Sequence, residues 1–229
     1  MIGIVIPAHN EEMVIGPCLA HARACARDVA LGGEHVEILV VADRCSDATA
    51  SIAARSGARV LEVDARNVGL ARAAGASALL ALGARWLAFT DADTLVAEDW
   101  LSQQLALDAE AVCGTVEVTD WTPHGENALF LSRHFATSYR DADGHRHVHG
   151  ANLGVAAHAY LRAGGFQDLA CSEDVALVTE LERTGARICW SARPRVRTSA
   201  RKVARAPGGF ADALLNAVAS QFLGKPAVA

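Results

Sequence analysis

The chain has 229 residues, enough for one large domain with a substantial core. Its 21 Lys and Arg against 26 Asp and Glu give a net charge of −5, which argues against capture of nucleic acid or an anionic membrane by charge. Hydrophobic residues make up 52% and aromatic residues 5%, which favours aliphatic strands covered by alanine-rich helices.

Strand and helix patterns alternate in the first half of the chain. The predicted strands are the aliphatic runs Ile2–Ile6, Glu37–Val41, Arg59–Val63 and Trp86–Phe89. The predicted helices begin at Pro17, run from Ser46 or Asp47 to Gly57, and cover Gly69–Leu82 and Glu98–Asp108. This rhythm predicts an α/β fold with a mostly parallel central sheet and helices on both faces.

The second half is less regular after residues 112–118. It contains a polar, His-rich loop at Asp141–His149, a short helix ending near Gly165, a helix over Asp174–Thr184 and a strand over Arg187–Trp190. Phe210–Leu223 carries an apolar stripe at helical spacing, which fits either a core helix or the face of a homodimer. Because no linker rich in Pro or Ser divides the chain, we expect a single domain over residues 1–229.

Cysteines and apolar runs bear on the location of the protein. The six cysteines are scattered and form no Cys-x-x-Cys pair, which predicts buried, reduced thiols. The chain begins directly in an apolar strand, without the basic start of a signal peptide. No apolar run reaches the roughly 18 residues typical of a membrane span. We therefore expect a cytoplasmic protein without stable membrane insertion.

Two carboxylates follow the fourth predicted strand. In an extended Asp91-Ala92-Asp93 both carboxylates would point to one side, at the carboxyl end of a buried parallel strand. Open α/β sheets bind ligands at this edge, and two hard oxygen ligands suit a divalent cation, which in turn suits a diphosphate. A solvated turn is the alternative.

Polar residues also follow the other three strands. The first strand leads into Pro7-Ala8-His9-Asn10-Glu11, which lacks the G-x-G-x-x-G of nicotinamide and flavin enzymes and could meet a nucleoside. Asp43 could accept hydrogen bonds from a base or a ribose. Arg72 lies near a predicted helix N-terminus, and a guanidinium and a helix N-terminus both favour phosphate. For each of these residues, an ordinary helix-entry or solvated position is the alternative.

Two further segments could bind ligands. His145, His147 and His149 alternate and could hold Zn²⁺ on one face, although a mobile loop on the acceptor side is favoured. Residues 198–201 and 208–210 could form a lid over the site, with Arg201 or Arg205 reaching phosphate.

Taken in order, these pieces resemble the family 2 glycosyltransferases of the GT-A fold. The resemblance runs through Ile4–Glu11, Asp43, Asn67–Gly69, Asp91–Asp93, His149–Gly154, Gly164–Phe166 and Glu173-Asp174. It implies transfer of one sugar from a UDP- or GDP-sugar to a hydroxyl of a small or lipid-linked acceptor. It also implies Mg²⁺ or Mn²⁺ as cofactor, with residues 1–118 as the nucleotide-sugar-binding half and 119–229 as the acceptor half.

The resemblance assigns a role to each matching residue. Asp174 would be the catalytic base, and Asp91 and Asp93 would bind the metal. The donor-binding residues would be Pro7, Ala8, His9, Glu11, Asp43, Asn67, Arg72, Asp91 and Ala92. The acceptor-side residues would be His149, Gly150, Asn152 and Glu173.

Several departures from the family pattern narrow this reading. Ala42-Asp43 stands where an acidic pair is common, so Asp43 would act alone. The Q-x-x-R-W signature of processive synthases is absent, which favours single addition. No His follows position 158, so solvent or another group would complete the metal coordination. A sugar-phosphate nucleotidyltransferase and a non-catalytic nucleotide-sugar-binding protein are the alternatives, and the choice between inversion and retention stays open.

Overall fold

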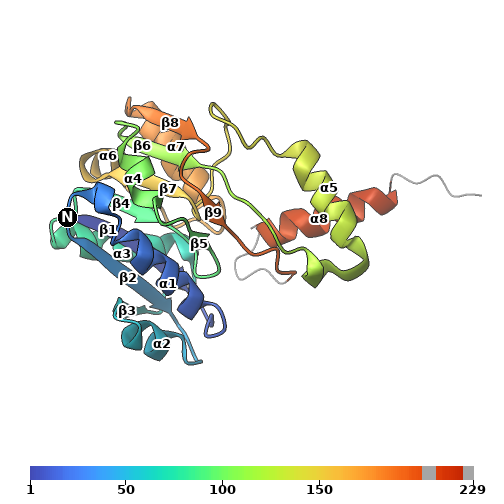
Figure 1. The fold of residues 1–229 in the computed structure, drawn as a ribbon, viewed down its shortest axis with the longest axis horizontal. Helices are drawn as coiled ribbons and strands as arrows, with labels where there is room; N and C mark the ends of the chain where they lie inside the picture. The colour runs from blue at the N-terminus through green and yellow to red at the C-terminus, as the bar shows by residue number, and fades with distance from the viewer. Residues whose placement is uncertain (203–209, 224–229) are drawn as a thin grey trace, which may run out of the picture.

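The computed structural model describes residues 1–202 and 210–223, and a seven-stranded sheet lies at its centre (Figure 1). The strand order is β3-β2-β1-β4-β7-β6-β8. The strands are β1 (Ile2–Ala8), β2 (Val36–Asp43), β3 (Arg59–Val63), β4 (Trp86–Phe89), β6 (Ala111–Gly114), β7 (Leu153–Ala156) and β8 (Ile188–Ser191). β7 is antiparallel to both of its neighbours, and the other strands all run in one direction. The predicted mostly parallel α/β sheet is confirmed.

Helices and short elements surround this sheet. The α-helices are α1 (Ile15–Cys25), α2 (Thr49–Arg55), α3 (Val68–Ala81), α4 (Trp100–Leu105), α5 (Ala128–Ser138), α6 (Ala157–Arg162), α7 (Glu173–Arg183) and α8 (Phe210–Leu223). The 3₁₀ turns η1 (Val29–Leu31) and η2 (Thr122–Asn127) and a two-stranded sheet of β5 (Leu95–Val96) and β9 (Val196–Arg197) complete the described elements.

The helix α3 packs against β1 and β2 at very short range. A Cβ on Gly75 would lie 2.6 Å from Val5 and 2.8 Å from Val41, so only glycine permits this approach. Because side chains alternate along a strand, Val5 faces α3 while Ile4 and Ile6 face the opposite layer, and all are fully buried. Right-handed crossovers place α1 and α3 on opposite faces of the sheet, as Figure 1 shows.

The helices α5 and α8 form an arm beside the sheet (Figure 1). They share a small cluster of buried side chains, namely Leu131, Ala200 and Leu214, which is separate from the main core. Leu215, the neighbour of Leu214, is 45% exposed. The apolar stripe of α8 therefore packs, at least at Leu214, into the core of this arm.

Element bounds agree best with prediction in the parallel half. β3 and β4 have their predicted bounds, and β1 and β2 are longer by two and three residues at most. The helix expected from Pro17 begins at Ile15, and the one expected over Glu98–Asp108 covers Trp100–Leu105. The antiparallel strand β7, the helix α5 and the small sheet were not predicted.

The strand β7 escapes sequence reasoning because it contains Gly154. A Cβ at this position would lie 2.6 Å from the Trp86 ring and would overlap the amide of Gln104. Packing between neighbours therefore demands a glycine, which weakens the strand signal in the sequence.

The cysteines match the prediction in part. All six lie among the described residues and are free thiols, but Cys171 is exposed rather than buried. No helix within residues 1–202 and 210–223 has both the length and the apolar character needed to cross a membrane.

The order of the strands locates the ligand site. From β1 the chain moves to β2 on one side, and it later returns to place β4 on the other side. Such a switch of direction opens a crevice beyond the carboxyl ends of the strands. The polar residues that follow β1, β2, β3 and β4 meet there.

Candidate functional site

A pocket of about 1270 Å³ lies at these strand ends, which is larger than the roughly 300–1,000 Å³ of most small-molecule sites. The predicted residues that line it are Pro7, Ala8, His9, Glu11, Asp43, Asn67, Arg72, Asp91, Ala92, Asp93, His149, Gly150, Glu173 and Asp174. Asn152, which was also predicted for the site, does not line it.

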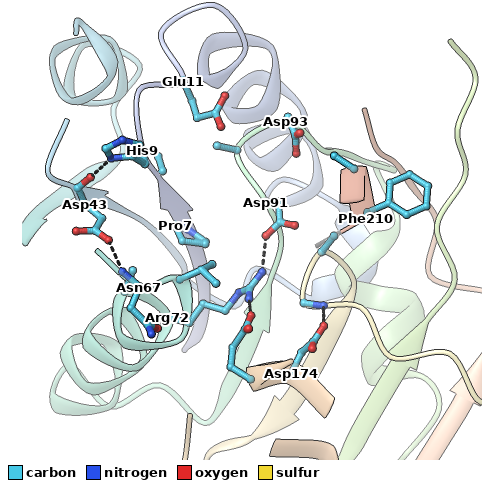
Figure 2. Close-up of a pocket in the computed structure, with 18 of the residues that line it drawn as sticks. Pro7, His9, Glu11, Asp43, Asn67, Arg72, Asp91, Asp93, Asp174 and Phe210 are labelled. Carbon is cyan, nitrogen blue, oxygen red and sulfur yellow. Dashed lines mark hydrogen bonds and ion pairs between the residues drawn. The ribbon is translucent and has the colours of Figure 1, made fainter. Parts of the chain in front are cut away.

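Asp43 organises one side of the pocket. Its Oδ1 accepts hydrogen bonds from the backbone N–H groups of Ala65 (2.8 Å) and Arg66 (3.0 Å), and its Oδ2 accepts one from Asn67 (3.1 Å; Figure 2). His9 Nδ1 lies 2.7 Å from the backbone oxygen of Asp43. The carboxylate thus fixes the loop before α3 and keeps acceptor capacity for a ligand on Oδ2. Its hold on the loop was not predicted from the sequence.

Asn67 joins two parts of the chain at the same side. Its Oδ1 accepts from the N–H of Leu70 (3.0 Å) and caps α3, while its Nδ2 donates to the oxygen of Leu169 (2.8 Å). The Asn67 amide is therefore engaged in holding the pocket wall.

Asp91 and Asp93 do not lie in an extended segment, so the expectation that both point to one place is wrong. The N–H of Thr94 donates to the oxygen of Asp91 (3.1 Å) and closes a turn. The Asp91 carboxylate points toward Arg72, 2.6 Å away, while Asp93 lies farther along the pocket, 3.1 Å from Arg201 (Figure 2). The turn gives the two carboxylates different partners.

Arg72 is not a free phosphate ligand, contrary to prediction. It is 4% exposed, and its guanidinium forms ion pairs with both Asp91 and Glu173. It occupies the space that a side chain at position 150 would need, so Gly150 is required there. Glu173 points inward to Arg72, and burial raises the pKa of its carboxyl. Both side chains line the pocket, so a contact of either with a ligand stays a prediction.

Asp174 lies in the first turn of α7. Its Oδ2 accepts from the N–H of Gly150 (2.8 Å), and its Oδ1 accepts from its neighbour Val175 (2.8 Å). Figure 2 shows Asp43 and Asp174 on different sides of the group formed by Arg72 and Asp91. A carboxylate held in this way can take a proton from a hydroxyl placed in the pocket.

His149 lines the pocket near Asp174. The Tyr139 hydroxyl accepts from the N–H of Val116 (2.8 Å) and lies 2.9 Å from His149 Nε2, so its own proton is available to that nitrogen. Burial lowers the pKa of His149 to about 4, which keeps the imidazole neutral near pH 7. A neutral imidazole ring held in one orientation can form a hydrogen bond with a molecule bound in the pocket.

Asn152 has a structural position instead of the predicted acceptor-side one. It is fully buried, its Oδ1 accepts from Trp100 Nε1 (2.8 Å), and its Nδ2 donates to the oxygens of Thr115 (2.7 Å) and Pro194 (2.9 Å). These bonds join distant segments of the core.

The His-rich loop is exposed over residues 141–144 and packed from His145 onward, and its mobility stays a prediction. The rings of His145 and His147 stack with centroids 5.5 Å apart, and those of His147 and His149 with centroids 6.0 Å apart. His145 is 1% exposed and meets Trp190 edge to face. Within residues 1–202 and 210–223, no group of three or more His, Cys, Asp or Glu side chains is arranged to hold a metal ion, so a zinc site in this loop is not supported.

Part of the predicted lid reaches the pocket. Thr198, Ser199 and Arg201 line it, and Arg201 donates to Glu11 Oε1 (2.6 Å). Phe210 of the predicted lid lines the pocket as well, whereas Arg205, Gly208 and Gly209 lie outside the described residues.

Two carboxylates of the pocket supply part of the coordination that a divalent cation needs. Asp93 is 9% exposed, and burial raises the pKa of its carboxyl to about 6. Asp93 and Glu11 share Arg201 as a partner, so two carboxylates lie near one point. Mg²⁺ is usually bound by one or two carboxylates together with substrate phosphates and water. The donor set thus fits a cation whose coordination a diphosphate completes.

Comparison with known proteins agrees with this geometry. A sequence model described as "Glycosyl transferase family 2" matches residues 3–156, which is most of the chain and includes β1 to β4 and β7. The chain belongs to this family. A stretch of 70 residues is 39% identical to the low-salt glycan biosynthesis hexosyltransferase Agl6 of Haloferax volcanii. This stretch covers 31% of this chain and 16% of the relative.

Solved structures of glycosyltransferases share the GT-A fold of this family member. S. aureus TarS 1-349 in complex with UDP-GlcNAc superposes with a TM-score of 0.65 at 14% identity, over 99% of this chain and 68% of that one. The mannosyltransferase PcManGT of Pyrobaculum calidifontis in complex with GDP-Man and Mn²⁺ superposes with a TM-score of 0.64 at 18% identity, over 99% of this chain and 65% of that one. A longer TarS chain is covered over 36% of its length. The chain therefore spans only part of these relatives.

Proposed function

We propose that this chain transfers one sugar from a nucleoside-diphosphate sugar to a hydroxyl acceptor, with the assistance of Mg²⁺ or Mn²⁺. The observation that carries the proposal is the meeting in one pocket of Asp43 at the end of β2, Asp93 in the turn after β4 and Asp174 at the start of α7. Their positions match three separate needs: nucleoside recognition, charge neutralisation at the diphosphate, and proton removal.

The nucleotide-binding part of the proposal rests on residues 1–118. Asp43 Oδ2 and His9 would meet the nucleoside, next to the loop that Asp43 fixes. Asp93, with Glu11 beside it, would hold the cation, which as a Lewis acid stabilises charge on the departing diphosphate. The nucleotide-sugar complexes of TarS and PcManGT support a UDP- or GDP-sugar donor.

The transfer itself would depend on residues 119–229. The Asp174 carboxylate would take the proton of the acceptor hydroxyl as that oxygen attacks the anomeric carbon. A base on this side of the pocket favours inversion at that carbon. Asp174 keeps the N–H of Gly150 as a fixed donor, which holds the carboxylate in place. We expect a small or lipid-linked acceptor next to His149.

Thermal denaturation with and without ligands tests the proposal. UDP or GDP should raise the melting temperature when Mn²⁺ is present, and nucleoside triphosphates alone should not. A response confined to triphosphates would instead indicate a nucleotidyltransferase, and no response to any diphosphate would refute the proposal. Incubation with a set of nucleotide sugars and detection of slow hydrolysis then identifies the donor, and binding without hydrolysis or transfer would indicate a non-catalytic binding protein.

A further inference from the structure

Arg201 occupies an unusual position between two carboxylates of the pocket. Its Nη1 donates to Glu11 Oε1 at 2.6 Å, and its Nη2 lies 3.1 Å from Asp93 Oδ2. Glu11 follows β1, Asp93 lies in the turn after β4, and Arg201 follows β9. One guanidinium from the C-terminal part of the chain thus pairs with two acidic side chains that are 7% and 9% exposed.

This arrangement places Arg201 in competition with any cation at Asp93. A divalent ion on Asp93 would stand within a few ångströms of the guanidinium, and two positive charges at that range repel each other much more strongly inside a protein than in water. The carboxylates already have a charged partner, so an incoming cation gains less from them. A bound diphosphate changes this balance, because its oxygens offer the guanidinium a bidentate partner.

We propose that Arg201 is the internal counter-ion of the donor site before a nucleotide binds, so that Asp93 binds a divalent cation well only together with a nucleoside diphosphate. On loading, the guanidinium leaves Asp93 and Glu11 and binds the diphosphate. The inference rests on the proposed function for the identity of the nucleotide, but the competition between Arg201 and the cation does not.

Arg201 is suited to such an exchange, and the other arginine at the centre of the pocket is not. Arg72 is 4% exposed and paired with two carboxylates on different elements, so a change of partner would leave buried charge without a counter-ion. The Arg201 side chain is 32% exposed and lies in a segment without helix or strand. Its neighbour Ala200 is buried in the core of the arm, so the side chain can change partners while the backbone stays anchored.

The test measures Mn²⁺ binding to the full chain without nucleotide, by electron paramagnetic resonance or calorimetry. Arg201→Gln removes the positive charge of this side chain. In the absence of nucleotide, the variant should bind Mn²⁺ roughly tenfold more tightly than the natural chain, which is within the range of ordinary coupling between sites. The same variant should bind UDP or GDP more weakly than the natural chain when Mn²⁺ is present. Arg201→Lys, a point charge without the planar fork, should lie between the two.

A matched control is Arg195→Gln, in the same C-terminal segment. Arg195 pairs with Asp141 at the surface and does not line the pocket, so its loss should change neither affinity. An Arg201→Gln protein that binds Mn²⁺ alone no better than the natural chain would overturn the inference. Absence of diphosphate binding by either protein, with the Mn²⁺ difference intact, would refute both the proposed function and the transfer of Arg201 to a diphosphate, and would support only its counter-ion role in the empty site.

Discussion

The Arg72 guanidinium donates a 2.6 Å hydrogen bond to the carboxylate of Asp91, and this bond joins α3 to the turn that follows β4. The other side of the same guanidinium is paired with Glu173 at the start of α7. Three elements that surround the pocket are therefore held at one buried positive charge. Asp174, the next residue after Glu173, takes its position from this network.

Loss of Arg72 should strongly destabilise the fold. Arg72→Met leaves the buried Glu173 and the partly exposed Asp91 without their cation, and breaking a buried ion pair typically costs about 3–5 kcal/mol of unfolding free energy. Chemical denaturation measures the change. The matched control is Arg85→Met, which breaks the exposed bidentate pair with Glu34 and should cost roughly 0–1 kcal/mol. Equal losses in both variants would contradict the structural role of Arg72.

Asp174→Asn should abolish most of the transfer activity while donor binding is retained. An amide cannot take the acceptor proton, and loss of a general base commonly lowers the rate by roughly 10²–10⁴-fold. Turnover and the affinity for the nucleotide sugar are measured separately. Asp108→Asn, at an exposed turn with a left-handed backbone that both residues adopt, serves as the control. Normal turnover in Asp174→Asn would remove the carboxylate from its role.

Asn152→Ala should lower stability and leave donor binding of the folded protein unchanged. The substitution removes the partners of the Trp100 indole and of two backbone oxygens, and each unpaired buried group costs about 1–3 kcal/mol. Urea denaturation and nucleotide titration distinguish the two effects. Asn127→Ala, whose side chain makes no capping bond to α5, should stay within about 0.5 kcal/mol. A specific loss of acceptor or donor binding would restore Asn152 to the site.

His149 should make the protein less stable as the pH falls from 6.5 toward 4. Burial lowers its pKa from the ordinary value of 6.5 to about 4, so in that window the unfolded chain binds a proton that the folded chain does not. The unfolding free energy therefore rises with pH through the window, and the contribution is constant above it. His149→Gln should flatten this part of the curve relative to the natural chain when melting is followed across pH 4–8. Parallel curves for the two proteins would contradict the assignment.

The sequence predicted the parallel half of the fold and the residues that gather at its edge. Runs such as Trp86–Phe89 are aliphatic or aromatic throughout and are bounded by polar residues, so both the strand and the position of Asp91 follow from local pattern. The sequence did not predict contacts between residues that are distant from each other in the chain. Glu173 lies 101 residues from Arg72, and nothing near either residue signals that they meet.

The same limit explains the other corrections. Asn152 resembles a site residue in sequence, but its three partners come from segments that only the folded chain brings together. The turn at Asp91–Thr94 depends on one backbone hydrogen bond, and local composition fits an extended segment equally well. The strand β7 requires Gly154 because of Trp86 and Gln104, which are neighbours in space alone.

The small cluster of Leu131, Ala200 and Leu214 links the arm to the chemistry of the pocket. Ala200, 1% exposed, is fixed by contacts with α5 and α8, and the next residue places its charge on Asp93 and Glu11. A shift in the packing at Ala200 would therefore move the Arg201 charge relative to Asp93 and Glu11. The balance of charge at the acidic end of the pocket thus depends on how α5 and α8 pack around Ala200, although neither helix supplies a carboxylate to that end.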